Sequence, residues 1–426
     1  MTPTWRRATA FSLFALLARS VVGDNAINPS FAYGKEPVRG VNLGGWLVLE
    51  PWITPSLFEN TGNESIVDEW TFCELQDWGT AATTLRKHWD TWITEQDLAD
   101  IAAAGLNHVR IPIGYWAFEV GPGEPYIQGQ LPYLSEAIGW AALHGLKVIV
   151  DLHGVPGSQN GYDNSGHRIP YPLWQTDAKN IKRTNAIMRT IAAMFAHFPQ
   201  VVSMVSPINE PAGYYGDSVM SVVKQYYRDS YATVRYAFGT PEESDAVVLL
   251  HDAFQPLSYW SGFDFAASGW QGVAVDTHIY QVFNTTVNAW TGDQHIAAAC
   301  SYASSLAGYD FWVIVGEWAP AATDCAKYLN GRGNGARYDG THPDAASAVG
   351  SCEGLTGSAS TFSADYKTFL AKFWEAQAIA FERGGQGWLQ WAWKAENADE
   401  WSYQAGLANG WIPRNPTNYV YPNICG

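Results

Sequence analysis

The stretch VVSMVSPINEP, from Val201 to Pro211, runs an apolar segment directly into a carboxylate and then into a proline. Its first five residues are apolar except for Ser203, which predicts a buried strand, and we place this strand from Val201 to Asn209. Glu210 comes after this strand, and a glutamate is rarely buried unless it is paired or has a chemical role. Because Pro211 restrains the backbone before it, the segment is predicted to end its strand by presenting Glu210 at the carboxyl end.

Seven other segments share this apolar character. They are Val38 to Trp46, His108 to Gly114, Lys147 to His153, Ala246 to Asp252, Val273 to Tyr280, Trp312 to Trp318 and Gly387 to Trp393. Segments with helical character lie between them, among them residues 95–104 and 181–198. Eight alternations of strand and helix predict an α/β fold of the (β/α)8 or TIM barrel type. A doubly wound sheet is disfavoured because no glycine-rich phosphate loop follows the first strand.

The N-terminal segment, the later apolar runs and the net charge bear on the location and the partners of the protein. Residues 1–23 combine a basic start, an apolar stretch and a small-residue exit, which predicts a signal peptide, and residues 24–426 are predicted to form one domain. No later apolar run is long enough to span a bilayer, so we expect a secreted, extracellular or cell-wall protein without a membrane partner. The net charge of −16 disfavours nucleic acid, and a monomer is the simplest expectation.

Polar and aromatic residues gather at the predicted strand ends. The candidates are Arg110, His153, Asn209, Glu210, His251, Asp252, His278, Tyr280, Glu317, Trp318, Trp391 and Trp393. One of these at a strand end is more often structural than functional, but many of them at the carboxyl rim of one barrel predict a site.

Two of these residues, Glu210 and Glu317, suit the cleavage of a glycosidic bond. That reaction needs one carboxylic acid to protonate the leaving oxygen and a second carboxylate to attack the anomeric carbon or to activate water. Strands four and seven lie on opposite sides of a barrel mouth, so a sugar fits between the two glutamates. Arg110 and Tyr280 are expected to hold Glu317 ionised, and Asn209 is expected to donate to a sugar hydroxyl.

Other chemistries leave little trace in the sequence. No Gly-x-Ser-x-Gly elbow is present for an esterase, and no His-Glu-x-x-His or Cys-x-x-Cys is present for zinc. A barrel metal site built from Asp151, His153, His251 and His278 is the alternative, but it leaves both glutamates and the 21 tryptophans unexplained. We therefore expect no metal and no organic cofactor.

The chain resembles a fungal exo-β-1,3-glucanase of glycoside hydrolase family 5. The stretches that carry the resemblance span residues 39 to 401 and are RGVNLGGWLVLEPWITPS, HVRIPIGYWAF, VIVDLHGVPGSQNGYDNSG, SPINEP, DTHIYQVF, VGEWAPAATDCAKYLNGRG and WLQWAWKAENADEW. The resemblance implies that Glu210 is the acid/base and Glu317 the nucleophile. It implies these substrate contacts: Glu50, Arg110, His153, Asp163, Asn164, Asn209, His278, Tyr280 and either Trp391 or Trp393, with Trp391 preferred.

Three further expectations follow from the resemblance. Phe283 matches one of the family's two phenylalanines at the pocket mouth, whereas Tyr162 stands at the other position. The family's cysteine pattern implies disulfides Cys300–Cys425 and Cys325–Cys352, with Cys73 free. The acid/base role implies a raised pKa for Glu210 and an ionised Glu317.

We therefore predict a retaining enzyme that releases glucose from the non-reducing ends of β-1,3-glucan. Within the family, the alternatives are cleavage of β-1,6-glucan or β-glucosides, or transfer of glucose in place of hydrolysis. From a different class, the alternative is a catalytically silent glucan-binding barrel, which the presence of both glutamates disfavours.

Overall fold

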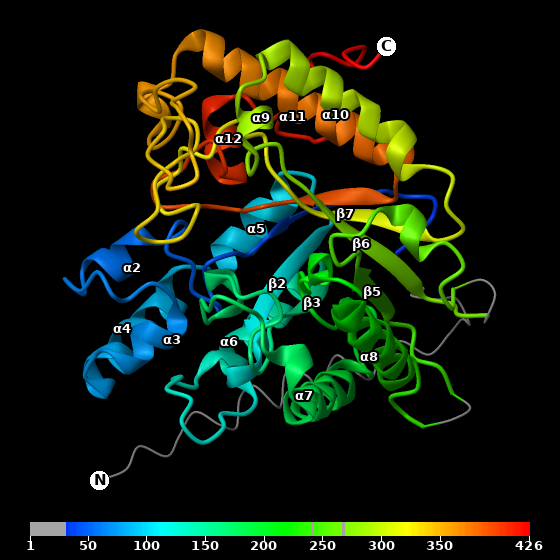
Figure 1. Ribbon diagram of the computed structural model, residues 1–426. Coiled ribbons are helices and arrows are strands. Elements are labelled where there is room, and N and C mark those ends of the chain that lie inside the picture. The colour runs from blue at the N-terminus through cyan, green and yellow to red at the C-terminus, as the bar shows by residue number, and fades with distance from the viewer. Residues whose placement is uncertain (1–30, 240–241, 266–268) are drawn as a thin grey trace.

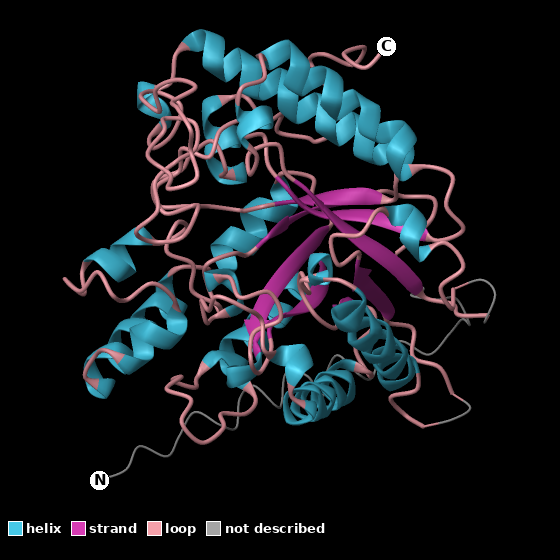
Figure 2. Cartoon of the chain, in the orientation of Figure 1, coloured by secondary structure: helices cyan, strands magenta, loops and turns pink. Residues whose placement is uncertain are grey.

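The computed structural model describes residues 31–239, 242–265 and 269–426, so the predicted signal peptide lies outside the described residues. Eight parallel strands close into a barrel in sequential order, from β1 beside β2 to β8 beside β1 (Figures 1 and 2). The strands are β1 (Val38–Asn42), β2 (His108–Gly114), β3 (Lys147–Gly154), β4 (Val202–Ser206), β5 (Val247–His251), β6 (Val273–Ile279), β7 (Trp312–Trp318) and β8 (Gly387–Gln390). The prediction of a (β/α)8 barrel is confirmed.

Helices surround this barrel, and Figure 1 shows α10 and α11 lying side by side along one flank. The α-helices are α2 (Pro55–Glu59), α3 (Glu69–Glu74), α4 (Trp78–Thr91), α5 (Glu95–Ala103), α6 (Gln130–Leu143), α7 (Ala178–Phe195), α8 (Asp217–Arg235), α9 (Thr285–Asn288), α10 (Gly292–Leu306), α11 (Ala364–Gly384) and α12 (Tyr403–Asn409). The short 3-10 turns are η1 (Tyr115–Ala117), η2 (Asp163–Ser165), η3 (Trp174–Thr176), η4 (Gly213–Tyr215), η5 (Leu257–Trp260) and η6 (Ala359–Thr361). Among the described residues, no helix is both long enough and apolar enough to cross a bilayer.

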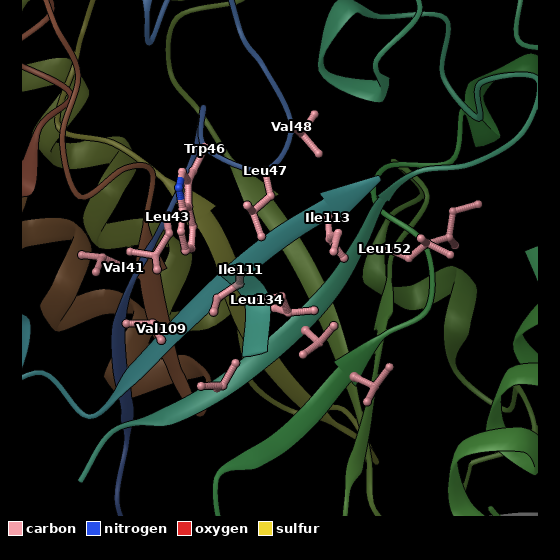
Figure 3. Packing of buried hydrophobic residues seen from close by; sticks show 14 of the residues in the cluster. Val41, Leu43, Trp46, Leu47, Val48, Val109, Ile111, Ile113, Leu134 and Leu152 are labelled. Carbon is pink, nitrogen blue, oxygen red and sulfur yellow. The ribbon is translucent and has the colours of Figure 1, made fainter. Parts of the chain in front are cut away.

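Most predicted strands agree with the structure, and β2 and β7 have the predicted bounds. The first and last predicted strands are too long, because the sheet ends at Asn42 and Gln390 while the apolar sequence continues. Beyond those points the apolar residues pack in loops. Leu43 and Trp46 belong to the main hydrophobic cluster (Figure 3). Trp393 is buried in the same cluster.

Alternation along the strands separates two layers of the core. Val109, Ile111 and Ile113 of β2 belong to the cluster that also contains Leu134 of α6, so the outward side of this strand packs toward the helices (Figure 3). A second cluster fills the interior of the barrel and contains Val38, Ile149, Met204, Val247, Leu249, Ala274, Ile314 and Leu389. The barrel is therefore closed by apolar side chains below the level at which polar residues begin.

Two disulfides join distant parts of the chain. Cys300 of α10 is bonded to Cys425 near the C-terminus, and Cys325 is bonded to Cys352 within the long segment after β7. These are the pairs that the family resemblance implied. Cys73 is free and buried in α3.

Candidate active site

The inward positions of several strands change from apolar to polar toward the carboxyl end. In β3 the inward residues are Ile149, Asp151 and His153, and in β6 they begin with Ala274 and continue with Asp276 and His278. Because successive inward residues are two positions apart, each strand adds one layer of polar side chains above the apolar layer. The polar layers lie at the rim where barrel enzymes build their sites.

Arg110 of β2 is the centre of this polar layer and is fully buried. Its Nη1 donates to Glu317 Oε1 at 2.8 Å and to Asn42 Oδ1 at 3.0 Å. Its Nη2 donates to Asn209 Oδ1 at 2.7 Å and lies 3.1 Å from Asp151 Oδ2. Burial lowers the pKa of Arg110, but the charges of Asp151 and Glu317 outweigh burial and raise it. The guanidinium therefore stays charged and fixes Glu317 and Asn209 together.

Glu210 follows β4, as the sequence predicted, but β4 ends at Ser206, so Asn209 lies after the strand and not at its last position. Glu210 has a positive φ of 46°, a backbone conformation that non-glycine residues rarely adopt. Its Oε1 lies 2.7 Å from His278 Nδ1, and its Oε2 accepts from Asn164 Nδ2 at 3.2 Å. Arg110 can only donate, so its bond to Asn209 Oδ1 fixes the amide orientation. Asn209 Nδ2 is buried and has no partner among the described residues.

His278 lies among three carboxylates. Its Nδ1 is 2.7 Å from Glu210 Oε1 and 3.4 Å from Glu317 Oε2, and its Nε2 is 3.4 Å from Asp276 Oδ2. Burial lowers the pKa of His278, but the charges of Glu317 and Asp276 outweigh burial and raise it well above its ordinary value. Tyr280 donates its hydroxyl to Glu317 Oε2 at 2.9 Å. His278 therefore carries a positive charge between the two glutamates.

The pKa values of the two glutamates run opposite to the expected order. Burial raises the pKa of Glu210, but the hydrogen bond and the charge of His278 outweigh burial and lower it below its ordinary value. Burial also raises the pKa of Glu317, and the charges of His278 and Arg110 do not fully offset that rise. The prediction of a raised pKa for Glu210 is wrong for the free protein, because the sequence alone placed no cation beside Glu210.

A cavity of about 480 Å³ opens above these carboxylates. Its lining includes both glutamates and eight other predicted residues: Glu50, Tyr162, Asp163, Asn164, His278, Tyr280, Phe283 and Trp391. The size is that of a small-ligand site. The cavity therefore brings together most of the residues that the sequence analysis selected.

Two acidic residues of this lining have an oxygen without a protein partner. Glu50 Oε2 accepts from Trp52 Nε1 at 3.1 Å, whereas its Oε1 is buried and unpartnered among the described residues. Asp163 Oδ1 accepts from the backbone N–H of Asn164, and its Oδ2 has no partner within the described chain. Burial raises the pKa of Asp163 to about 7, and burial followed by the charges of Asp163 and Glu317 raises that of Glu50. Buried oxygens of this kind are satisfied by a polar ligand.

The two tryptophans after β8 have different environments. Trp391 lines the cavity, and its ring stacks on that of His153 with centroids 5.5 Å apart. Trp393 does not line the cavity, because its indole is buried in the main core and donates to Asp97 Oδ1 at 2.9 Å. Of the two candidates, Trp391 therefore lies at the cavity and Trp393 does not, which favours the preferred Trp391 as the contact.

Arg110, His153 and Asn209 are the remaining predicted residues, and they lie below the lining. His153 Nδ1 contacts Asp151 Oδ2 at 2.6 Å, while its Nε2 has no partner among the described residues. The sequence analysis missed several lining residues: Trp52, Arg168, Phe254, Leu329, Asn330, Gly331, Arg337 and Trp401. Most belong to long loops, where no strand period signals an inward direction. Phe254 is the exception, since it follows the predicted strand end at Asp252 by two residues.

The structure brings together a possible metal cluster that shares only His251 and His278 with the four residues considered from the sequence. Within the described residues, Glu210, His251 and His278 place one ligand atom each within 4.8 Å of one another. The backbone N–H of Ala253 donates to His251 Nδ1 at 2.9 Å, so the ring proton lies on Nε2. His278 is held protonated by its carboxylates. Because metal binding needs a free imidazole lone pair, these residues fit a metal poorly.

Two carboxylates at opposite strands of a barrel rim, above a polar floor and beside exposed aromatic rings, define a glycoside hydrolase site. The sequence family described as "Cellulase (glycosyl hydrolase family 5)" matches residues 72–331. The chain belongs to this family and is a glycoside hydrolase.

Similar proteins support this assignment along almost the whole chain. "Probable glucan 1,3-beta-glucosidase A" of Aspergillus niger is 45% identical over 98% of this chain and 97% of its own length. The protein of the same name from Emericella nidulans is 47% identical over 96% of this chain and 98% of its own length. "Glucan 1,3-beta-glucosidase" of Blumeria graminis is 44% identical over 93% of this chain and 91% of its own length.

Solved structures share the fold at lower identity. The rutinosidase from Aspergillus niger has a TM-score of 0.70 at 21% identity and covers 89% of this chain and 99% of its own. A family 5 xyloglucanase from Paenibacillus pabuli has a TM-score of 0.51 at 14% identity and covers 83% of this chain and 89% of its own. These likenesses concern the barrel architecture alone.

Proposed function

We propose that the chain is a retaining exo-β-1,3-glucosidase in which Glu317 is the nucleophile and Glu210 the acid/base. The names of the relatives, which are at least 44% identical to this chain in the three cases described, support action on a glucan 1,3-β linkage. The substrate is a β-glucan chain that enters the cavity with its non-reducing end.

The position of His278 carries the retaining assignment. One nitrogen, Nδ1, lies 2.7 Å from Glu210 Oε1 and 3.4 Å from Glu317 Oε2. These two oxygens are therefore separated by no more than the sum of those distances. For this pair of oxygens, that limit lies below the separation of at least about 6.5 Å between the two carboxyl groups of inverting glycosidases, which need room for a water. The arrangement supports direct attack by a carboxylate.

In the first step, Glu317 attacks the anomeric carbon and the glycosidic bond breaks. Arg110 and Tyr280 each hold one oxygen of Glu317, so the carboxylate is oriented before substrate arrives. The leaving oxygen takes a proton from Glu210. Since the pKa of Glu210 is lowered in the free protein, His278 supplies this proton across the 2.7 Å hydrogen bond to Oε1.

In the second step, Glu210 acts as a base on the water that cleaves the ester at Glu317. The charge of Glu317 is absent in the ester, and this charge is the largest favourable contribution to the raised pKa of His278. Formation of the ester therefore weakens the hold of His278 on the proton that it releases in the first step. When water cleaves the ester, the charge of Glu317 returns, and the proton that Glu210 takes from water passes back to His278 across the same hydrogen bond. Glu210 is left as a buried carboxylate beside the incoming water, which suits a base.

Four contacts are proposed to recognise the glucose that reacts. Asn209 donates through its unpartnered Nδ2, and Glu50 and Asp163 accept from hydroxyls through their unpartnered oxygens. Trp391 offers its ring to one face of the sugar. Polar groups that bind hydroxyls behind the reacting centre leave room for a single glucose there, which supports exo action. Tyr162 and Phe283 flank the mouth, where the next glucose binds.

Export and a monomeric state complete the proposal. The signal-like pattern of residues 1–23 and the two disulfides support an oxidising location. Intact-mass thiol counting on the secreted protein tests whether the two disulfides are formed there, and the expected result is one free cysteine.

The product profile tests the function directly. Laminarin and β-1,6- and β-1,4-glucans are digested briefly, and the products are separated by size. We expect glucose alone from laminarin, and early mixtures of oligosaccharides would contradict exo action. Glucose released mainly from the β-1,6-glucan would contradict the linkage, and a build-up of longer oligosaccharides would indicate transfer of glucose in place of hydrolysis.

Azide products test the roles of the two glutamates. Glu317→Ala leaves space for azide to attack an activated β-glucosyl fluoride from the opposite face, and this gives an α-azide. Glu210→Ala still forms the glycosyl ester when the leaving group is good, so azide then gives a β-azide. The reverse pair of products, read by proton NMR, would exchange the roles.

A further inference from the structure

Exposed aromatic rings gather beside the mouth of the cavity. Six of them are each between 40% and 47% exposed: Tyr162, Tyr171, Tyr214, Tyr215, Phe254 and Phe283. Tyr162, Phe254 and Phe283 line the cavity, whereas the other three lie outside its lining. Large apolar rings grouped on a surface mark a place where a ligand or partner binds.

Four of the rings form a continuous strip that leads away from the cavity. Phe254 contacts Tyr214 with ring centroids 5.5 Å apart, Tyr214 contacts Tyr215 at 4.9 Å, and Tyr215 contacts Tyr171 at 4.6 Å. The hydroxyl of Tyr214 also donates to that of Tyr162 at 2.9 Å. The strip is therefore joined to the cavity at two of its lining residues, Tyr162 and Phe254.

The backbone holds these rings in place at some cost. Phe254 has a φ of 58° and Ala253 a φ of 54°, and a bulky residue with positive φ is an outlier. Phe254 is fixed there because its N–H donates to Asp252 Oδ1 at 2.8 Å. Gly213, which begins the turn η4 that carries Tyr214 and Tyr215, lies so close to Ala253 that a β-carbon would clash with its carbonyl oxygen. Strain that persists beside a cavity points to function.

We propose that Tyr171, Tyr214, Tyr215 and Phe254 form a platform that binds the glucose units of a β-glucan chain beyond those at the cavity mouth. This inference rests on the proposed function, because it assigns the rest of the same polymer to the surface that continues from the cavity. Neutral rings stack on the C–H faces of sugars, and tyrosine hydroxyls exchange hydrogen bonds with sugar hydroxyls. The platform offers no charge, which fits a neutral polysaccharide.

The platform should make affinity depend on chain length. A disaccharide reaches only the cavity and its mouth, whereas a pentasaccharide also covers the strip. The enzyme is therefore expected to prefer long β-1,3-glucan chains over short ones, and this preference is set by residues that do not touch the reacting glucose.

Calorimetric binding to a Glu317→Ala background tests the platform without turnover. The probes are the β-1,3-linked disaccharide and pentasaccharide of glucose. Adding Tyr171→Ala and Tyr215→Ala should weaken binding of the pentasaccharide about tenfold, which is about 1.4 kcal/mol, and binding of the disaccharide less than about twofold. Tyr171→Phe with Tyr215→Phe keeps the rings and should retain most of the affinity.

Phe238→Ala is the matched control. Phe238 is 41% exposed and contacts His197, but it lies between α8 and β5, at the opposite end of the barrel from the cavity. This variant should bind both probes as the background does. Thermal unfolding of each variant shows whether it is folded.

Three results would overturn the platform. In the first, the double alanine variant binds both oligosaccharides more weakly by the same factor, and in the second it binds both as the background does. In the third, measured with an aryl β-glucoside that carries a two-ring aglycone as an additional probe, it loses affinity for that glucoside alone. The last result would assign the strip to aromatic aglycones. Failure of the proposed function is seen separately, as the absence of glucose when the wild-type protein is incubated with the same pentasaccharide.

Discussion

Asn209 offers a sharp test of how the site recognises its sugar. Its Oδ1 accepts from Arg110 Nη2 at 2.7 Å, so its Nδ2 must point its hydrogens elsewhere, and they meet no partner among the described residues. We predict that Nδ2 donates to the hydroxyl next to the anomeric carbon. The perturbation is Asn209→Ala, measured with an aryl β-glucoside and with its 2-deoxy counterpart.

The magnitude follows from the burial of this amide. When the wild-type protein binds the 2-deoxy substrate, the buried donor stays unpaired, which costs about 1–3 kcal/mol. The wild-type preference for the hydroxylated substrate therefore contains a contribution of about 5- to 150-fold from this one contact. Asn209→Ala has no donor to leave unpaired, so that contribution should disappear.

The ratio of kcat/KM values for the two substrates is the readout. Asn209→Ala also removes one acceptor from Arg110, but this loss affects both substrates alike and cancels in the ratio. The intrinsic reactivity of the 2-deoxy compound cancels when the variant ratio is divided by the wild-type ratio. If the variant keeps the wild-type ratio within about twofold, Asn209 does not read this hydroxyl, since the weakest expected effect is about fivefold.

Three other predictions concern charge, stability and the two tryptophans. His278→Gln removes a cation that lowers the pKa of Glu317, so this pKa should rise and the acid limb of the pH profile of kcat/KM should move to higher pH. An acid limb at the wild-type pH would contradict the reasoning. Replacing Cys300 and Cys425 by serine should lower the unfolding free energy by up to about 5 kcal/mol, and replacing Cys325 and Cys352 should lower it by about 3.5 kcal/mol, because the first disulfide joins residues 125 positions apart and the second joins residues 27 positions apart. Denaturant titration measures both losses, and the reverse order would refute the argument from loop length. Trp393→Phe removes a hydrogen-bond donor to Asp97, so it should lower the unfolding free energy by about 1 kcal/mol and leave KM unchanged, whereas Trp391→Ala should lower kcat/KM. Equal effects of the two variants on the kinetics would mean that both rings contact the sugar.

The fold was predictable because strand signals in this chain are local. The apolar segment from His108 to Gly114 matches β2 to the residue, and Trp312 to Trp318 matches β7. The sequence overextended β1 and β8, since an apolar side chain in a loop looks the same in a sequence as one in a strand. Leu43 and Trp46 are buried by tertiary packing that no local period announces.

The site was predictable where residues end strands and not where loops fold back. His278 and Glu317 follow from their positions near the carboxyl ends of β6 and β7, and Glu210 follows from its position after β4. By contrast, Arg168 and Arg337 enter the cavity from long irregular segments. The pKa order also required the structure, because it depends on the 2.7 Å contact between His278 and Glu210, residues 68 positions apart.

The backbone at Glu210 has a consequence for how this protein responds to selection. A non-glycine residue at a φ of 46° costs about 1–3 kcal/mol, and the buried carboxylate adds a desolvation cost. Folding alone would therefore favour glycine at this position. A library randomised at residue 210 and sorted only for resistance to heat should enrich glycine, whereas the same library sorted for glucose release should return glutamate. A position where the chain gives up stability is thus one where the proposed chemistry leaves no choice of side chain.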